Sequence, residues 1–166
     1  MKSLLLLSSF IAAGIFAGTA LAADPPDTAT FVGKVAGGNL FEIESSQIAI
    51  RKTRNGEVKA FAEKMVMDHT AAGAKFKAAV GEARIEMPPD KLDSKHQAIV
   101  KQLEATDAST IDKPYIDAQK EAHVETVALF EAYAGRGEDP RLKKFAQELL
   151  PTLKAHLEHV NRLQAK

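Results

Sequence analysis

The 166-residue sequence contains no cysteine and no tryptophan, and aromatic residues make up only 6% of it. Without cysteine the protein can form neither disulfide bonds nor thiolate metal sites, and it offers no thiol nucleophile. Stability must therefore come from the packing of apolar side chains.

A surplus of charge of one sign is also missing, because 22 basic residues balance 22 acidic residues. Binding of nucleic acid through its phosphates requires a basic surface, so we expect no nucleic-acid partner. The sequence likewise lacks a glycine-rich phosphate loop, a serine nucleophile elbow and a zinc-protease histidine pair. We therefore expect no catalytic residues and no enzymatic activity.

The first 22 residues have the pattern of a secretory signal peptide. Lys2 supplies a basic start, Leu4 to Phe16 form an apolar run, and Ala20 and Ala22 provide the small residues that signal peptidase requires. The apolar run is shorter than the roughly 20 residues that a membrane span needs. We therefore expect cleavage, no stable membrane insertion afterwards, and a periplasmic or secreted protein.

Beyond a short linker at residues 23–29, the sequence has the apolar periodicity of helices. Start and stop signals place helices at about 30–52, 57–84, 94–105, 112–135 and 140–163. Two of these starts combine a capping aspartate with a nearby proline, at Asp112 and Asp139. The mature chain of about 144 residues suffices for one domain with a single core.

The connections between these helices predict their topology. Asn55 and Gly56 form a tight turn, whereas the connection from about residue 85 to residue 108 can cross the length of a bundle. Two antiparallel helix hairpins joined by one long crossover are typical of ferritin-like bundles. We therefore expect residues 30–166 to form an all-α, ferritin-like four-helix bundle with a short extra helix in the crossover.

Three segments carry a family resemblance. They are EVKAFAEKMVMDHT at residues 57–70, YIDAQKEAH at residues 115–123 and LPTLKAH at residues 150–156. These segments resemble domain-of-unknown-function family 4142, and the similarity extends over nearly the whole mature chain. The resemblance implies a ferritin-like bundle exported by bacteria, and it implies no activity.

Three histidines, His69, His123 and His156, lie on the apolar stripes of three different predicted helices. A buried neutral imidazole needs a hydrogen-bond partner or a metal, because an unpaired buried polar group costs about 1–3 kcal/mol. These histidines therefore indicate a site in the core. The other two histidines, His96 and His159, are expected at the surface.

The helix rise of 1.5 Å per residue predicts how deep each histidine lies. Measured from the end with the Asn55 turn, His69 lies about 20 Å along the bundle, and His123 lies at a similar depth. His156 comes out roughly 8–10 Å nearer to that end, so a cluster of all three requires an offset of more than one turn. Pro151 could provide it by kinking the last helix.

Two glutamates, Glu42 and Glu44, fall within about one turn of His69 and His123. Glu44 has the more apolar neighbours at helical spacing, so it is the first choice for an inward carboxylate, with Glu42 as its substitute. Asp68, which adjoins His69 in sequence, lies about 100° around the helix from it and is expected in solvent.

Two interpretations of these residues remain open. In the favoured one they form a metal-free polar layer without a cofactor, in an exported, non-enzymatic bundle that serves envelope stress or binds a protein partner in the cell envelope. In the alternative, His69, His123 and His156 bind zinc, copper or iron together with Glu44 or Glu42. The Glu-x-x-His motif of ferritin-type di-iron centres is absent, so iron oxidation and storage are not expected. No large apolar surface stripe is evident, so we expect a monomer or a weak dimer.

Export provides the first testable prediction. Mass spectrometry of the protein from the cell envelope should find Ala23 as the first residue, because cleavage is expected after Ala22. A mature species that retains the segment from Leu4 to Phe16 would contradict the prediction.

Overall fold

The computed structural model describes residues 26–165, which form five α-helices and no strand. The helices are α1 (Thr28–Lys52), α2 (Gly56–Ala83), α3 (Ser94–Ala105), α4 (Asp112–Arg136) and α5 (Pro140–Arg162). The all-α prediction is confirmed, with helix ends close to those expected. The expected signal peptide, residues 1–22, lies outside the described residues.

Short polar side chains define most helix starts by accepting hydrogen bonds from the first free backbone N–H groups. The caps of α1, α2, α3 and α5 are Asp27, Asn55, Asp93 and Asp139. The prediction that Asp112 caps α4 was wrong. Asp112 lies within the helix and accepts a hydrogen bond from the Thr53 hydroxyl at 2.5 Å, so it ties the start of α4 to the end of α1.

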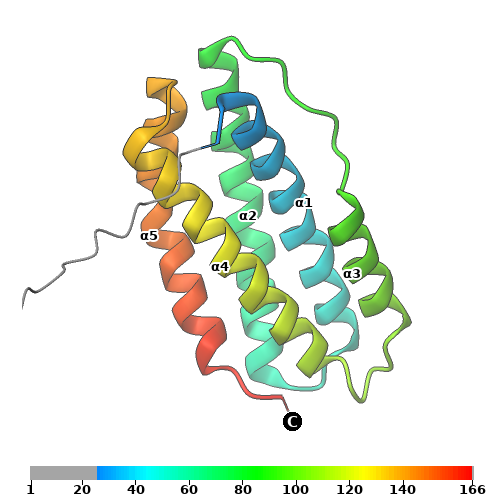
Figure 1. Cartoon of the computed structure of the whole chain (residues 1–166). Helices are drawn as coiled ribbons and strands as arrows, with labels where there is room; N and C mark the ends of the chain where they lie inside the picture. The colour runs from blue at the N-terminus through cyan, green and yellow to red at the C-terminus, as the bar shows by residue number, and fades with distance from the viewer. Residues whose placement is uncertain (1–25, 166) are drawn as a thin grey trace, which may run out of the picture.

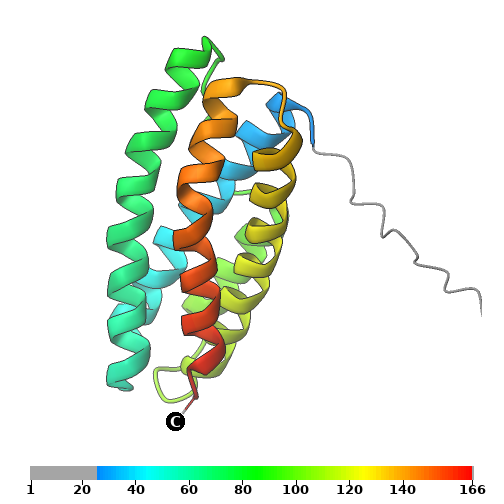
Figure 2. The same cartoon turned by 90° about the vertical axis from the view of Figure 1, so that its left-hand side faces the viewer.

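The long helices pair as two hairpins, α1 with α2 and α4 with α5 (Figure 1). The hairpins pack together through α2 against α5 and α1 against α4, as a second view shows (Figure 2). The connection from α2 to α4 runs from one end of the bundle to the other, and its helix α3 lies along α1. Within residues 26–165, no helix combines the length and apolarity that crossing a membrane would require.

Buried polar residues divide the core of the bundle in two. Towards one end, α1, α2, α4 and α5 contribute an apolar cluster that includes Phe31, Phe76, Phe130 and Phe145. Towards the other end, the same four helices contribute a cluster that includes Ile48, Phe61, Tyr115 and Val160. Between the clusters lies what we call the polar layer, which consists of Glu42, Ser45, His69, Gln119, His123 and His156.

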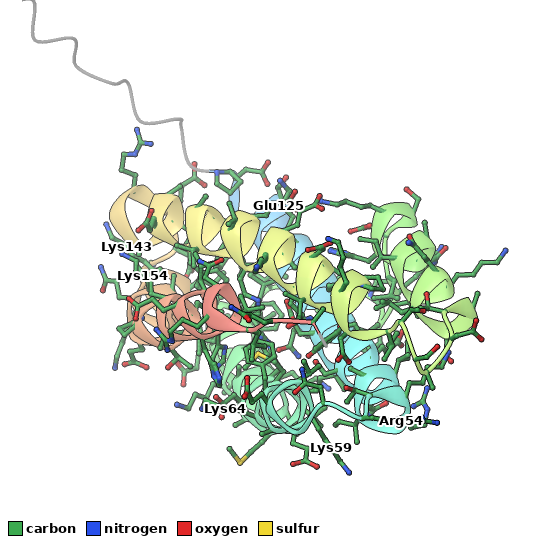
Figure 3. All side chains as sticks on the ribbon, turned by 90° about the horizontal axis from the view of Figure 1, so that it is seen from below. Arg54, Lys59, Lys64, Glu125, Lys143 and Lys154 are labelled. Carbon is green, nitrogen blue, oxygen red and sulfur yellow. The ribbon has the colours of Figure 1, made fainter. Side chains whose placement is uncertain are left out.

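The charged side chains, by contrast, surround the bundle. Seen along the helices, Lys59 and Lys64 of α2 and Lys154 of α5 lie on its outside (Figure 3). Each of the three is exposed to solvent. The helices therefore expose their charged faces and bury two apolar layers with the polar layer between them.

Phe61 and Lys59 test this division, because they belong to the same helix and face opposite environments. Phe61 is fully buried and Lys59 is exposed. Phe61→Ala should lower the free energy of unfolding by about 3–5 kcal/mol through the cavity it leaves. Lys59→Ala should stay within about 0.5 kcal/mol of the wild type. Denaturant unfolding measures both, and equal losses would contradict the described core.

Candidate metal centre

The three core histidines come from α2, α4 and α5 and meet in the polar layer. His69, His123 and His156 are 6%, 0% and 2% exposed. Their ring centroids are 5.5–6.0 Å apart. One nitrogen from each ring can be chosen so that all three lie within 4.8 Å of one another. These three residues are the group in the described part of the chain that has the spacing of a metal site.

The count that placed His156 a turn or more away from the other two was wrong, and side-chain direction explains part of the error. Side chains lean towards the N-terminus of their own helix. Because α2 and α5 are antiparallel, His69 leans towards the Asn55 end of the bundle and His156 leans away from it. In addition, α5 stops at Arg162, and the chain continues to the Asn55 end outside the helix, where the Asn55 side chain donates to the Gln164 carbonyl at 3.0 Å.

Each histidine ring uses one nitrogen to donate a hydrogen bond to an oxygen at the edge of the cluster. His69 Nδ1 contacts Asn39 Oδ1 at 3.2 Å, and His123 Nδ1 contacts the backbone carbonyl of Gln119 at 2.9 Å. His156 Nε2 contacts Asp68 Oδ2 at 2.8 Å. Carbonyl and carboxylate oxygens can only accept, so in each neutral ring the bonded nitrogen carries the proton.

The second nitrogen of each ring is left as an acceptor. These atoms are His69 Nε2, His123 Nε2 and His156 Nδ1, and all three are buried without a hydrogen-bond partner among the described residues. When the rings are neutral, these three lone pairs cannot satisfy one another, because none of the atoms then carries a hydrogen. Leaving buried polar atoms unpaired costs about 1–3 kcal/mol each. The arrangement is therefore unfavourable by itself and favourable around a positive centre.

The electrostatics keep His69 and His156 neutral. Burial, together with the proximity of His123 and His156, lowers the pKa of His69 to about 3. Burial also lowers the pKa of His156, although the hydrogen bond to Asp68 opposes this shift. Metal ions bind the neutral imidazole, so His69 and His156 are in the state that coordination requires.

The carboxylate in the polar layer is Glu42, and the preference for Glu44 was wrong. Glu42 is 4% exposed, and its Oε1 lies 3.5 Å from His123 Nδ1, whereas Glu44 is only half-buried and outside the cluster. Burial raises the pKa of Glu42, against the opposing effects of His123 and Gln119. Of its small or polar neighbours at helical spacing, Ser45 belongs to the polar layer and Asn39 contacts His69.

Asp68 also differs from expectation, because its carboxylate is largely shielded instead of solvated. Its side chain is 20% exposed, and Oδ2 accepts from both His156 and Lys64, the latter at 2.7 Å. Burial acts to raise the pKa of Asp68, but the hydrogen bonds from Lys64 and His156 outweigh it and lower the pKa. Asp68 is therefore an anion that orients the ring of His156.

The two histidines expected at the surface are half-buried and stay outside the cluster. His96 stacks on Phe41 with ring centroids 4.5 Å apart, and His159 contacts the edge of Phe61 at 5.1 Å. Asn39, by contrast, was missed as a partner of His69. The sequence signal for Asn39 was that it is a polar residue about one turn before Glu42, on the same face of α1 and in an otherwise apolar stripe.

Three imidazoles with oriented rings form a donor set that suits zinc, copper or cobalt. A hydrogen bond from the second nitrogen of each metal-binding histidine to a carboxylate or carbonyl is the usual outer shell of such sites. Three protein ligands would leave a further coordination position free, as in open zinc sites.

Comparison with known proteins adds the family and supports the fold. A family model described as "Domain of unknown function (DUF4142)" matches residues 16–163. No curated protein matches the chain. A crystal structure of a DUF305 fragment from Deinococcus radiodurans is similar in structure, with a TM-score of 0.68 and 14% sequence identity, over 82% of this chain and 96% of that one. At this identity the likeness concerns the fold alone. Because the family model covers most of the sequence, the chain belongs to the DUF4142 family of domains of unknown function.

Proposed function

We propose that this protein binds a divalent transition metal ion, zinc or copper, through His69, His123 and His156. Two observations carry the proposal: one nitrogen from each ring lies within 4.8 Å of the others, and each ring has one hydrogen-bonded nitrogen and one buried nitrogen without a partner in the described chain. A bound cation would satisfy all three nitrogens at once, which a metal-free layer of this geometry does not.

The charges around the cluster support a cation. Asp68 accepts a hydrogen bond from His156 at the edge of the cluster, and Glu42 lies beside His123. These two carboxylates can offset part of a divalent charge that is buried in a medium of low polarity, although Asp68 also pairs with Lys64. Because the sequence has no cysteine, thiolates cannot bind the ion, and the ligands are imidazoles. Imidazole ligands suit zinc and copper.

We also propose that the bundle has ferritin-like connectivity but not ferritin chemistry. The two antiparallel hairpins and the long connection containing α3 support the connectivity. The positions three residues before the histidines are Val66, Lys120 and Leu153, so the chain lacks the glutamates of a di-iron centre. The proposed role is thus a single mononuclear site in a non-enzymatic protein.

An exported location, periplasmic or secreted, completes the proposal. Its support is the signal-peptide pattern of residues 1–22. In the described chain, the large apolar side chains that are exposed are Met67 on α2 and Val124 on α4, which offer little apolar area for a stable partner. We therefore retain a monomer or weak dimer that acts in the cell envelope.

Removal of one ligand tests the metal site. For wild-type protein purified without a histidine tag, zinc at about 100 times its Kd should raise the free energy of unfolding by about 2.7 kcal/mol relative to chelator. His123→Ala should lose most of this gain, because one of three ligands is gone. Denaturant midpoints with excess Zn²⁺ and with chelator give both values, and Cu²⁺ is tested in the same way.

His159→Ala is the matched control, since it removes a half-buried histidine that lies outside the cluster. It should keep the full zinc-dependent gain. A wild-type midpoint that neither zinc nor copper moves would refute the metal site. In that case His123→Ala should destabilise equally with and without chelator, as a metal-free polar layer requires.

Asp68→Asn tests the outer hydrogen bond. Loss of a carboxylate that orients a metal-binding histidine typically weakens metal affinity by about 10–100-fold. Asp117→Asn is the matched control, because Asp117 pairs with Lys113 at i,i+4 spacing just as Asp68 pairs with Lys64, but on the exposed surface of α4. Competition titration with a zinc indicator measures both, and equal affinities of the two variants would show that Asp68 does not support the site.

A further inference from the structure

Two hollows meet at one wall of the polar layer. A small cavity of about 30 Å³ is lined by His69 and, among others, by Phe76 and Phe145. A groove of about 560 Å³ lies between α1, α3 and α4 and is lined by Asp93 and His96 at the start of α3. Both hollows share the residues Lys34, Gly38, Glu42, Thr126 and Leu129. The groove therefore leads to the wall behind which the histidines lie.

Glu42 is the polar group of that shared wall. Its side chain is 5% exposed, and its Oε2 is buried without a hydrogen-bond partner in the part of the chain described. Its other oxygen lies 3.5 Å from His123. A buried carboxylate oxygen without a partner, between a groove and a cluster of imidazoles, is suited to receive a cation on its way from one to the other.

Gly38 lies one helical turn before Glu42 in the same wall, and it has no side chain to thicken the wall. A Cβ built on Gly38 would have no atom of residues 26–165 within 4 Å. The space that a side chain would fill at this position is therefore open. Thr126 of α4, which also lines both hollows, is the opposite side of the same passage.

Between α2 and α5, the polar groups beside the cluster are already paired with one another. Asp68 Oδ2 is engaged by both His156 and Lys64. At the groove, Lys95 is similarly engaged by Glu121 and Glu125, the latter visible on the outer side of α4 (Figure 3). The carboxylate oxygen that remains available is thus on the groove side, at Glu42.

We propose that the groove between α1, α3 and α4 is the route by which a divalent cation enters and leaves the histidine cluster, passing Gly38 and Glu42. This inference rests on the proposed metal site and adds the path to it. The width of this passage determines how fast the cation enters and leaves, but it does not change the stability of the bound complex. A plug in it should therefore raise the barrier for entry and exit equally and leave the affinity unchanged.

Plugging the passage with leucine tests the route, with Co²⁺ as the probe because its visible absorption reports coordination. Stopped-flow mixing measures uptake, and a chelator chase measures release. Gly38→Leu and Thr126→Leu, which narrow the passage from opposite sides, should each slow both rates by about tenfold, with Kd within about threefold of the wild type. Gly33→Leu is the control, because Gly33 is exposed on the same helix and lines neither hollow. It should exchange Co²⁺ at the wild-type rate.

The outcomes separate the two proposals. Wild-type protein that binds none of Co²⁺, Zn²⁺ and Cu²⁺ would refute the metal site, and the route with it. Normal binding with wild-type rates in both plug variants would refute the route alone. Slower uptake with unchanged release would also refute it, because the substitution would then weaken the bound state instead of blocking the path. If one plug variant fails to fold, the other decides between these results.

Discussion

The mutual repulsion of three imidazole lone pairs in a buried layer is the constraint around which this bundle is organised. Each ring donates its single N–H to an oxygen at the edge of the cluster, and the other nitrogens of His69, His123 and His156 are buried without a partner among the described residues. Apolar clusters lie on both sides of this layer along the bundle axis. A positive centre would relieve all three nitrogens together.

All four long helices contribute residues to this arrangement. α2, α4 and α5 each supply one histidine, and α1 supplies Asn39 and Glu42. The antiparallel packing of α2 against α5 brings their side chains together from opposite directions. Asp68 links the cluster to the surface through Lys64, so the orientation of the His156 ring depends on an ion pair that is partly open to solvent. The site is thus a property of the whole bundle and not of one helix.

The fold by itself does not explain the polar layer. The DUF305 fragment shares the fold at 14% identity, and a shared fold is compatible with many different sites. The chain also lacks the glutamate positions of ferritin di-iron centres. What the fold leaves unexplained is the chemistry at the middle of the helices, where plain apolar residues would have packed more favourably than unpaired histidines.

The positions of the helices could be predicted from the sequence, because caps and apolar periodicity act over a few residues. Asn55 and Asp139 mark the starts of α2 and α5, and the same periodicity placed His69, His123 and His156 on buried stripes. Local rules suffice when both the signal and its effect lie within one helix.

Which polar atoms meet was decided only by the tertiary structure. The choice between Glu42 and Glu44 depended on which face of α1 the neighbouring helices cover, and the apolar neighbours of Glu44 along its own helix did not show this. The convergence of His156 with the other two depended on where α5 stops and on the opposite lean of side chains in antiparallel helices. The burial of Glu42 and the convergence of the histidines both depend on how the surfaces of different helices pack. Counting residues along one helix therefore cannot predict them.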